Sequence, residues 1–116
     1  MRDQALVALG ALLLLAHSSF AHAVLLETKP VANGQVAGPD VDVELRFNSR
    51  IDAARSRLTL VLPDQTAVAL PILASSTPAS LAARAKGLRA GEYRLRWQVL
   101  AADGHITRGE FRFQVK

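Results

Sequence analysis

Three residues in this 116-residue chain have side chains and positions suited to chemistry. Asp103 and His105 stand two positions apart in the segment Ala101–His105, and His22 stands near the start of the chain. Residues two apart on an extended backbone project to the same side, so this carboxylate and imidazole would lie together. Such a pair could be half of a metal site, an acid/base pair, or an uncommitted exposed pair. Asp-Gly between alternating strands is itself a hairpin signal, whereas nothing about a turn requires His105.

Residues 1–21 are typical of a secretory signal peptide. A basic start is followed by an apolar run over residues 5–16, which is shorter than the roughly 20 residues that a membrane-spanning helix needs. The small-x-small sequence Ser19-Phe20-Ala21 then predicts cleavage that makes His22 the first residue of the mature protein. Cleavage two residues later, after Ala23, would discard His22. An uncleaved N-terminal anchor is the remaining alternative.

A terminal His22 would be a chelating group, because its α-amino nitrogen and its imidazole Nδ1 can close a ring on one metal ion. If the first and last strands lie near each other at one end of the fold, His22, Asp103 and His105 converge. They would then offer three nitrogens and one oxygen, which suit tetragonal Cu(II), whereas Zn(II) prefers a tetrahedron and Cu(I) prefers sulfur. The chain has no Cys and its only Met is Met1, so a mature protein would have no sulfur ligand.

Alternation of apolar and polar residues predicts strands over 93–99, 109–115 and 41–47. Weaker patterns predict further strands over 24–28, 57–62, 66–70 and 80–86, with turns over 31–40, a loop over 74–78, and an irregular segment 48–56 that contains a short helical turn at 51–55. About seven short strands separated by turn signals favour a single small all-β domain, an antiparallel sandwich or barrel.

The net charge of +4 is unchanged by removal of Arg2 and Asp3, and seven basic residues lie between Arg84 and Arg112. They predict a solvated cationic face; a contact surface for acidic partners or anionic lipid is the alternative. Peripheral membrane contact has no support beyond this charge. Aromatic residues make up 5% of the chain, and no basic–aromatic interleaving suggests stacking on nucleic-acid bases, so no nucleic-acid binding is expected.

Several spaced motifs occur together along the chain: His22-Ala-x-Leu-x-x-x-x-Pro30, Val43-x-Leu-x-Phe47, Leu88-x-Ala-Gly-x-Tyr93-x-x-x-Trp97, Asp103-x-His105 and Gly109-x-Phe-x-Phe-x-Val115. In this order they resemble the CopC family, small periplasmic copper-binding β-sandwich proteins of bacterial copper resistance. The resemblance covers the whole of residues 22–116.

This resemblance implies an immunoglobulin-like Greek-key sandwich with one Cu(II) held by His22, Asp103 and His105. It implies a periplasmic copper carrier or buffer that is not an enzyme and serves copper resistance or homeostasis. An inner-membrane copper transporter of the CopD type would be its partner. Two departures matter. Some members have a second, Met-rich Cu(I) site, which this chain cannot build, and some have a Glu shortly after the second strand, where this chain has Asn48-Ser49-Arg50.

Two other functions compete with the copper carrier. A terminal His with a second His resembles the histidine brace of copper monooxygenases, but the chain is short, its aromatics are few, and Asp103 would occupy a position that oxygen activation needs. The other alternative is a β-sandwich interaction module that binds no metal.

Overall fold

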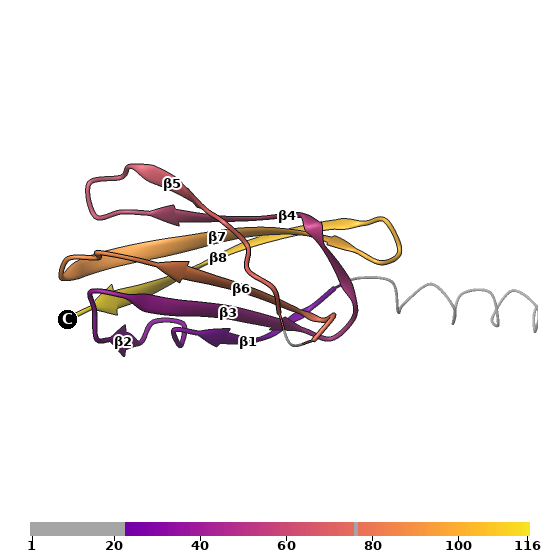
Figure 1. The fold of residues 1–116 in the computed structure, drawn as a ribbon, viewed down its shortest axis with the longest axis horizontal. Coiled ribbons are helices and arrows are strands. Elements are labelled where there is room, and N and C mark those ends of the chain that lie inside the picture. Colours follow the sequence, from indigo (N-terminus) through magenta and orange to yellow (C-terminus); the bar gives the residue numbers. More distant parts are fainter. Residues whose placement is uncertain (1–22, 76) are drawn as a thin grey trace, which may run out of the picture.

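Two facing sheets of eight strands form the part of the chain that the computed structural model describes, residues 23–75 and 77–116. The first sheet has the order β1-β3-β6 and the second has the order β2-β8-β7-β4-β5 (Figure 1). All strand pairs are antiparallel except β2 with β8. The strands are β1 (Leu25–Lys29), β2 (Gln35–Val36), β3 (Val41–Phe47), β4 (Ile51–Val61), β5 (Ala67–Leu70), β6 (Ser80–Ala85), β7 (Gly91–Ala101) and β8 (Ile106–Val115).

The all-β sandwich predicted from the sequence is confirmed. The alternating segments 41–47, 93–99 and 109–115 are strands, as expected, and the weak pattern over 80–86 is β6. The described residues contain no helix long and apolar enough to cross a membrane. The predicted signal peptide over residues 1–21 lies outside the described residues.

Two features of the strand prediction are wrong. The segment predicted as irregular, with a helical turn at 51–55, is the first half of β4, because Ile51 and Asp52 pair with the end of β7. The turn-rich segment 31–40 contains β2, so the sheets hold eight strands instead of about seven. β2 has two residues and pairs in parallel with the end of β8, so alternation could not reveal it.

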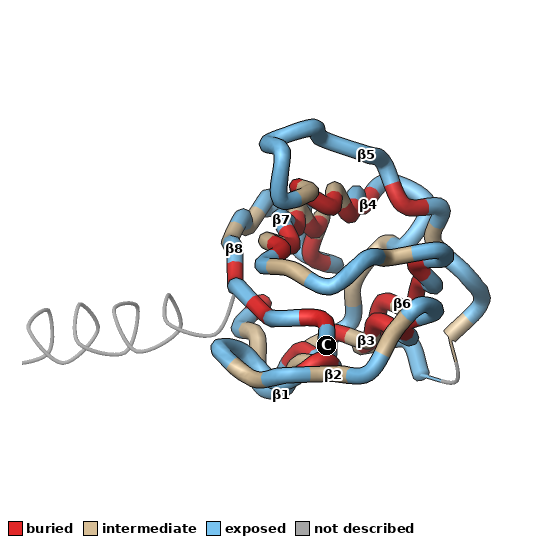
Figure 2. Tube along the Cα trace, turned by 90° about the vertical axis from the view of Figure 1, so that its left-hand side faces the viewer, coloured by how far each residue is buried: buried red, intermediate tan, exposed pale blue. Residues whose placement is uncertain are grey.

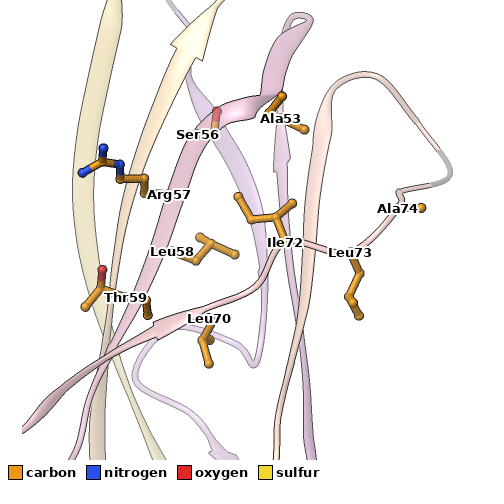
Figure 3. A pocket seen from close by; sticks show the side chains of 11 residues that line it. Ala53, Ser56, Arg57, Leu58, Thr59, Leu70, Ile72, Leu73 and Ala74 are labelled. Carbon is orange, nitrogen blue, oxygen red and sulfur yellow. The ribbon is translucent and has the colours of Figure 1, made fainter.

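A bulge separates the two halves of β4. The pairing with β7 shifts register between Asp52 and Arg57, and the Ser56 hydroxyl closes the gap by donating to the Asp52 carbonyl at 2.6 Å. Oγ of Ser56 also accepts the Leu100 backbone N–H at 3.3 Å. A pocket of about 730 Å³ lies beside the bulge of β4, where the chain leaves β5 (Figure 3). It is lined largely by Ala53, Leu58, Leu70, Ile72 and Leu73.

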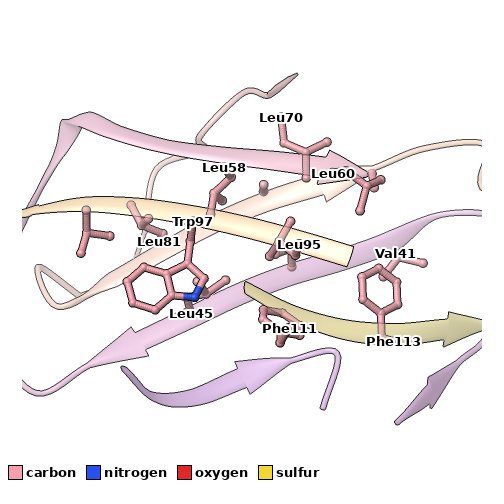
Figure 4. Packing of buried hydrophobic residues seen from close by; sticks show 14 of the residues in the cluster. Val41, Leu45, Leu58, Leu60, Leu70, Leu81, Leu95, Trp97, Phe111 and Phe113 are labelled. Atoms are coloured by element: carbon pink, nitrogen blue, oxygen red, sulfur yellow. The ribbon is translucent and has the colours of Figure 1, made fainter. Parts of the chain in front are cut away.

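The core lies between the sheets, where alternate residues of β3, β4, β6, β7 and β8 meet (Figure 2). Trp97 of β7 packs edge-on against Phe47 of β3, with ring centroids 5.4 Å apart. Tyr93 stacks on Phe113 at 5.7 Å, and its hydroxyl donates to the Arg89 carbonyl at 2.8 Å. These side chains and the surrounding leucines fill the sandwich (Figure 4). A chain without cysteine therefore relies on this packing to hold its two sheets together.

Gly109 makes room for the indole of Trp97. The two residues pair directly across β7 and β8, and a Cβ at position 109 would overlap Cζ2 of the indole. No real side chain approaches so closely, so the ring and the strand could not both keep their places. Position 109 is therefore a glycine because the indole of Trp97 occupies the space that a side chain would need.

We expect Gly109→Ala to lower the free energy of unfolding by about 1–3 kcal/mol, the usual cost of overpacking a core. Urea denaturation followed by Trp97 fluorescence measures the change. Gln114→Ala, on the exposed face of β8, is the matched control and should change stability by less than about 0.5 kcal/mol. Equal stability of the Gly109→Ala and unaltered proteins would contradict this account of the glycine.

Candidate metal centre

Asp103 and His105 lie in the tight turn that joins β7 to β8. The Ala101 backbone N–H donates to the His105 carbonyl at 2.8 Å, and the Gly104 N–H donates to the Ala101 carbonyl at 2.9 Å. Gly104 has a φ of 89°, which places it in the region that glycine enters without strain. A three-residue loop closed by a left-handed glycine is a common hairpin connection. β7 and β8, which pair at ten consecutive positions, therefore hold this turn in place.

The carboxylate of Asp103 holds the imidazole of His105. Its Oδ1 accepts the backbone N–H of His105 at 3.0 Å, and its Oδ2 lies 3.0 Å from Nδ1 of the ring. A carboxylate only accepts hydrogen bonds, so Nδ1 carries the proton in this contact, and Nε2 is the ring nitrogen suited to bind a metal. The sequence prediction that these two side chains lie together is confirmed, although a turn brings them together instead of an extended strand.

The start of the described chain is fixed at the same end of the sandwich. Ala23 is 1% exposed and belongs to the core. The Val24 backbone N–H donates to Oδ1 of Asn48 at 2.7 Å, and the Asn48 N–H donates to the Val24 carbonyl at 3.0 Å. Residue 24 is thus bound by two hydrogen bonds to the residue that follows β3.

The segment from Asn48 to Arg50 connects this start to the β7–β8 turn. Asn48 holds Val24, and two residues later the Arg50 carbonyl accepts the Ala102 backbone N–H at 3.2 Å. Ile51 then pairs with Ala101. Figure 1 shows the start of β1 and the β7–β8 turn at the same end of the molecule, opposite the C-terminus.

Of the three predicted ligands, the structure describes Asp103 and His105 and brings them into contact. His22 lies outside the described residues, directly before the buried Ala23. The described residues alone contain no group of three or more His, Cys, Asp or Glu side chains that could hold a metal. The proposed site therefore depends on His22.

Asn48 is the residue of this site that the sequence did not reveal. β1 and β3 pair antiparallel with Leu25 opposite Phe47, so residues 24 and 48 meet just beyond the pair. A correct pairing of these two strands was the signal that could have identified Asn48. Its Oδ1 accepts the backbone N–H of Val24, so the side chain anchors the start of the described chain.

Comparison with known proteins places this architecture in one family. A family model described as the CopC domain matches residues 25–116. The copper resistance protein C of Xanthomonas campestris pv. juglandis is 29% identical over 107 residues, which cover 85% of this chain and 84% of that protein. Protein YobA of Escherichia coli is 29% identical over 102 residues, covering 85% and 82%.

Two solved structures share the fold. CopC from Methylosinus trichosporium OB3b has a TM-score of 0.76 and 29% identity, and the match covers 82% of this chain and 94% of that one. PcoC from Escherichia coli, described as a methionine-rich copper resistance protein, has a TM-score of 0.69 and 26% identity, with 83% and 100% covered. Because the family model spans most of the sequence and the sandwich matches these structures, the protein belongs to the CopC family.

Proposed function

We propose that this protein is exported to the periplasm and carries or buffers Cu(II) in copper resistance, with one Cu(II) per chain. Residues 1–21 are the signal peptide in this proposal, and the mature domain begins at His22. The ligands are the amine and imidazole of His22, Asp103 and His105. The protein acts as a binder and not as an enzyme, and an inner-membrane transporter of the CopD type is its partner.

The observation that carries the proposal is the juxtaposition of two fixed points. The contact between Asp103 and His105 lies in a rigid turn, and Val24 is anchored beside the segment that touches this turn. His22 stands two residues before Val24, and a residue spans at most about 3.6 Å of extended chain. A mature terminus at His22 therefore remains at the end of the sandwich that carries Asp103 and His105.

The donor chemistry favours Cu(II) over Cu(I). Imidazole, amine and carboxylate suit Cu(II), whereas Cu(I) is bound by the soft sulfur of Cys and Met. PcoC is described as methionine-rich, but this chain has one Met, at position 1, and no Cys. The relatives named for copper resistance support copper as the cargo.

Each residue has a separate role in this site. Asp103 fixes His105 through both of its oxygens, Oδ1 on the backbone N–H and Oδ2 on the ring, and each oxygen retains a second lone pair that can coordinate a metal. His105 offers Nε2, and the tautomer is set by the contact of Nδ1 with Asp103. His22 closes a chelate ring through two nitrogens of one residue. Bound Cu(II) would be held here as cargo, by ligands that lie on a short turn and a chain terminus.

A variant with one extra residue before His22 tests this proposal. It keeps all three side chains and moves the α-amino group away, so we expect the Cu(II) affinity to fall by more than about 100-fold, beyond the 10–100-fold typical of outer-shell changes. Protons compete with the metal for amine and imidazole nitrogens, so binding by the native terminus should also weaken as pH falls from about 8 to 5. Competition titration and electron paramagnetic resonance measure the affinity and the nitrogen ligands.

Intact mass of the exported protein, with and without Cu(II), is the control for cleavage and stoichiometry. Equal affinity of the extended and native proteins would exclude the terminal chelate. A protein that loses all copper on dialysis would instead support the metal-free interaction module.

We expect His105→Ala and Phe111→Ala to have opposite effects. His105 lies in an exposed turn, so its loss should change the free energy of unfolding by less than about 0.5 kcal/mol while Cu(II) binding weakens strongly. Phe111 is a core side chain, 9% exposed, and its truncation should cost about 3–5 kcal/mol. Thermal melts of the apo-proteins and copper titrations measure the two effects. Unfolding by His105→Ala with binding intact would identify a structural histidine.

Asn48→Ala should weaken Cu(II) binding by about threefold to tenfold, because loss of one hydrogen bond of about 0.5–1.5 kcal/mol loosens the segment that positions His22. Asn48→Asp keeps an oxygen that can accept the Val24 N–H and should retain the affinity. Ser49→Ala is the neighbouring control and should bind as the unaltered protein does. Equal affinities of all four proteins would show that the anchor of Val24 has no part in binding.

A further inference from the structure

The outer face of the five-stranded sheet carries five of the thirteen basic residues in the described part of the chain. Alternate residues of β4, β7 and β8 point away from the core, and their registers align them in rows across the three strands. Within these rows stand five arginines and three acidic residues: Arg57, Arg94, Arg96, Arg108, Arg112, Asp52, Glu92 and Glu110. The charges are unequal in number, so some of the arginines have no carboxylate partner on this face.

The arginines nearer the C-terminal end of β8 each have a carboxylate partner within the sheet. Oε1 of Glu110 accepts hydrogen bonds from Arg94 at 3.3 Å and from Arg96 at 3.2 Å. Arg112 lies 3.7 Å from the carboxylate of Glu92. One carboxylate held by two arginines of the same strand shows what kind of group this face binds.

In the row nearest the β7–β8 turn, Asp52 stands opposite Leu100, and its carboxylate lies 3.8 Å from Arg55. The next row has no acid. Arg57 stands opposite Gln98, and Gln98 stands opposite Arg108. Side chains directly opposite on neighbouring strands have Cβ atoms about 4.5–5.5 Å apart, so a carboxylate at the middle position would reach both arginines. Gln98 places a neutral amide there, and its Oε1 accepts Nε of Arg108 at 2.9 Å. Among the described residues, neither Arg57 nor Arg108 forms an ion pair.

These two arginines border a hollow of about 540 Å³. Figure 3 shows Arg57 and Thr59 on the side of β4 opposite to Leu58 and Leu70, which point inward. The polar groups around the hollow are Arg57, Thr59, Arg96, Gln98, Arg108 and Glu110. Because Glu110 already holds two arginines, the charge left in the hollow is positive.

We propose that this hollow is a docking site for an acidic segment of a protein partner, with one carboxylate placed between Arg57 and Arg108. Arginine binds carboxylates through two parallel N–H groups, and Gln98 and Thr59 add neutral polar groups beside them. A flat bilayer would need charge spread over the whole face or apolar anchors. The two arginines without a carboxylate partner, Arg57 and Arg108, lie in one row. Among the described residues of the face, Ile106 is the one large exposed hydrophobic side chain.

The hollow lies close to the β7–β8 turn. Arg108 is three residues from His105 along β8, so a segment bound here lies beside the β7–β8 turn. The docking depends only on the sheet face and does not require a metal. An acidic partner would thus be held next to the end of the sandwich where the candidate ligands lie.

Titration of the exported, purified protein with hexaglutamate at low ionic strength tests the proposal, with the backbone and arginine side-chain N–H signals followed by NMR. We expect shifts centred on Arg57, Gln98 and Arg108, and binding that weakens with added salt. The double variant Arg57→Gln/Arg108→Gln should weaken hexaglutamate binding by up to about fivefold, since exposed ion pairs each contribute a fraction of a kcal/mol. Arg46→Gln/Arg84→Gln removes the same charge from the other sheet, where both arginines have acidic neighbours, and should bind nearly as the unaltered protein does.

Gln98→Glu gives an independent result, because it supplies the missing carboxylate from within the protein. It should leave the fold intact, slightly raise the melting temperature and weaken hexaglutamate binding by at least as much as the double variant does. Arg46→Gln changes the net charge by the same amount and should leave hexaglutamate binding nearly unchanged.

Three outcomes would overturn the proposal. Equal weakening by the two arginine pairs would show that only net charge matters. Unchanged binding by Gln98→Glu would place the acidic segment elsewhere. Binding to phosphatidylglycerol vesicles through Arg57 and Arg108, without binding of hexaglutamate, would make the face a membrane contact instead.

Discussion

The register of β7 against β8 is the constraint on which the rest of the structure depends. The two strands pair without interruption from Gly91 opposite Val115 to Leu100 opposite Ile106. Side chains alternate between faces, so a slip of one residue would exchange the core face and the outer face completely. The same register seats Trp97 over Gly109, aligns Gln98 with Arg108, and closes the turn that holds Asp103 against His105. Core, charged face and candidate ligands therefore share one structural determinant.

The candidate site needs a second support, because its third ligand comes from the other end of the sequence. β1 belongs to the three-stranded sheet and β8 to the five-stranded sheet, so no strand pairing joins them. The segment after β3 makes the connection, through Asn48 to Val24 and through Arg50 to Ala102. An amide suits this task, since its oxygen accepts a backbone N–H without adding charge beside a cation site.

Sequence alone predicted the parts of this protein that depend on local pattern. The strand over 41–47 and the final hairpin follow from alternation, and the closeness of Asp103 and His105 follows from their spacing. The first half of β4 was missed because its bulge disrupts the alternation, and β2 because two residues carry no period. Asn48 was missed because its role depends on which strands pair. The assignment of His22 as a ligand, which depends on cleavage, stays a prediction.

The site proposed above would hold a metal at the surface of a small sandwich, without an enclosed pocket. A ligand set on mobile loops would lose conformational freedom on binding, and ordering each residue costs about 1–2 kcal/mol. Here Gly104 and the Asp103 carboxylate already fix His105, and Ala23 is already buried. In the proposed site the remaining ligand is His22, whose two nitrogens would bind together. A site of this kind can be strong enough to retain Cu(II) and still open enough to release it to a partner, because the last ligand to join is also the first that can leave.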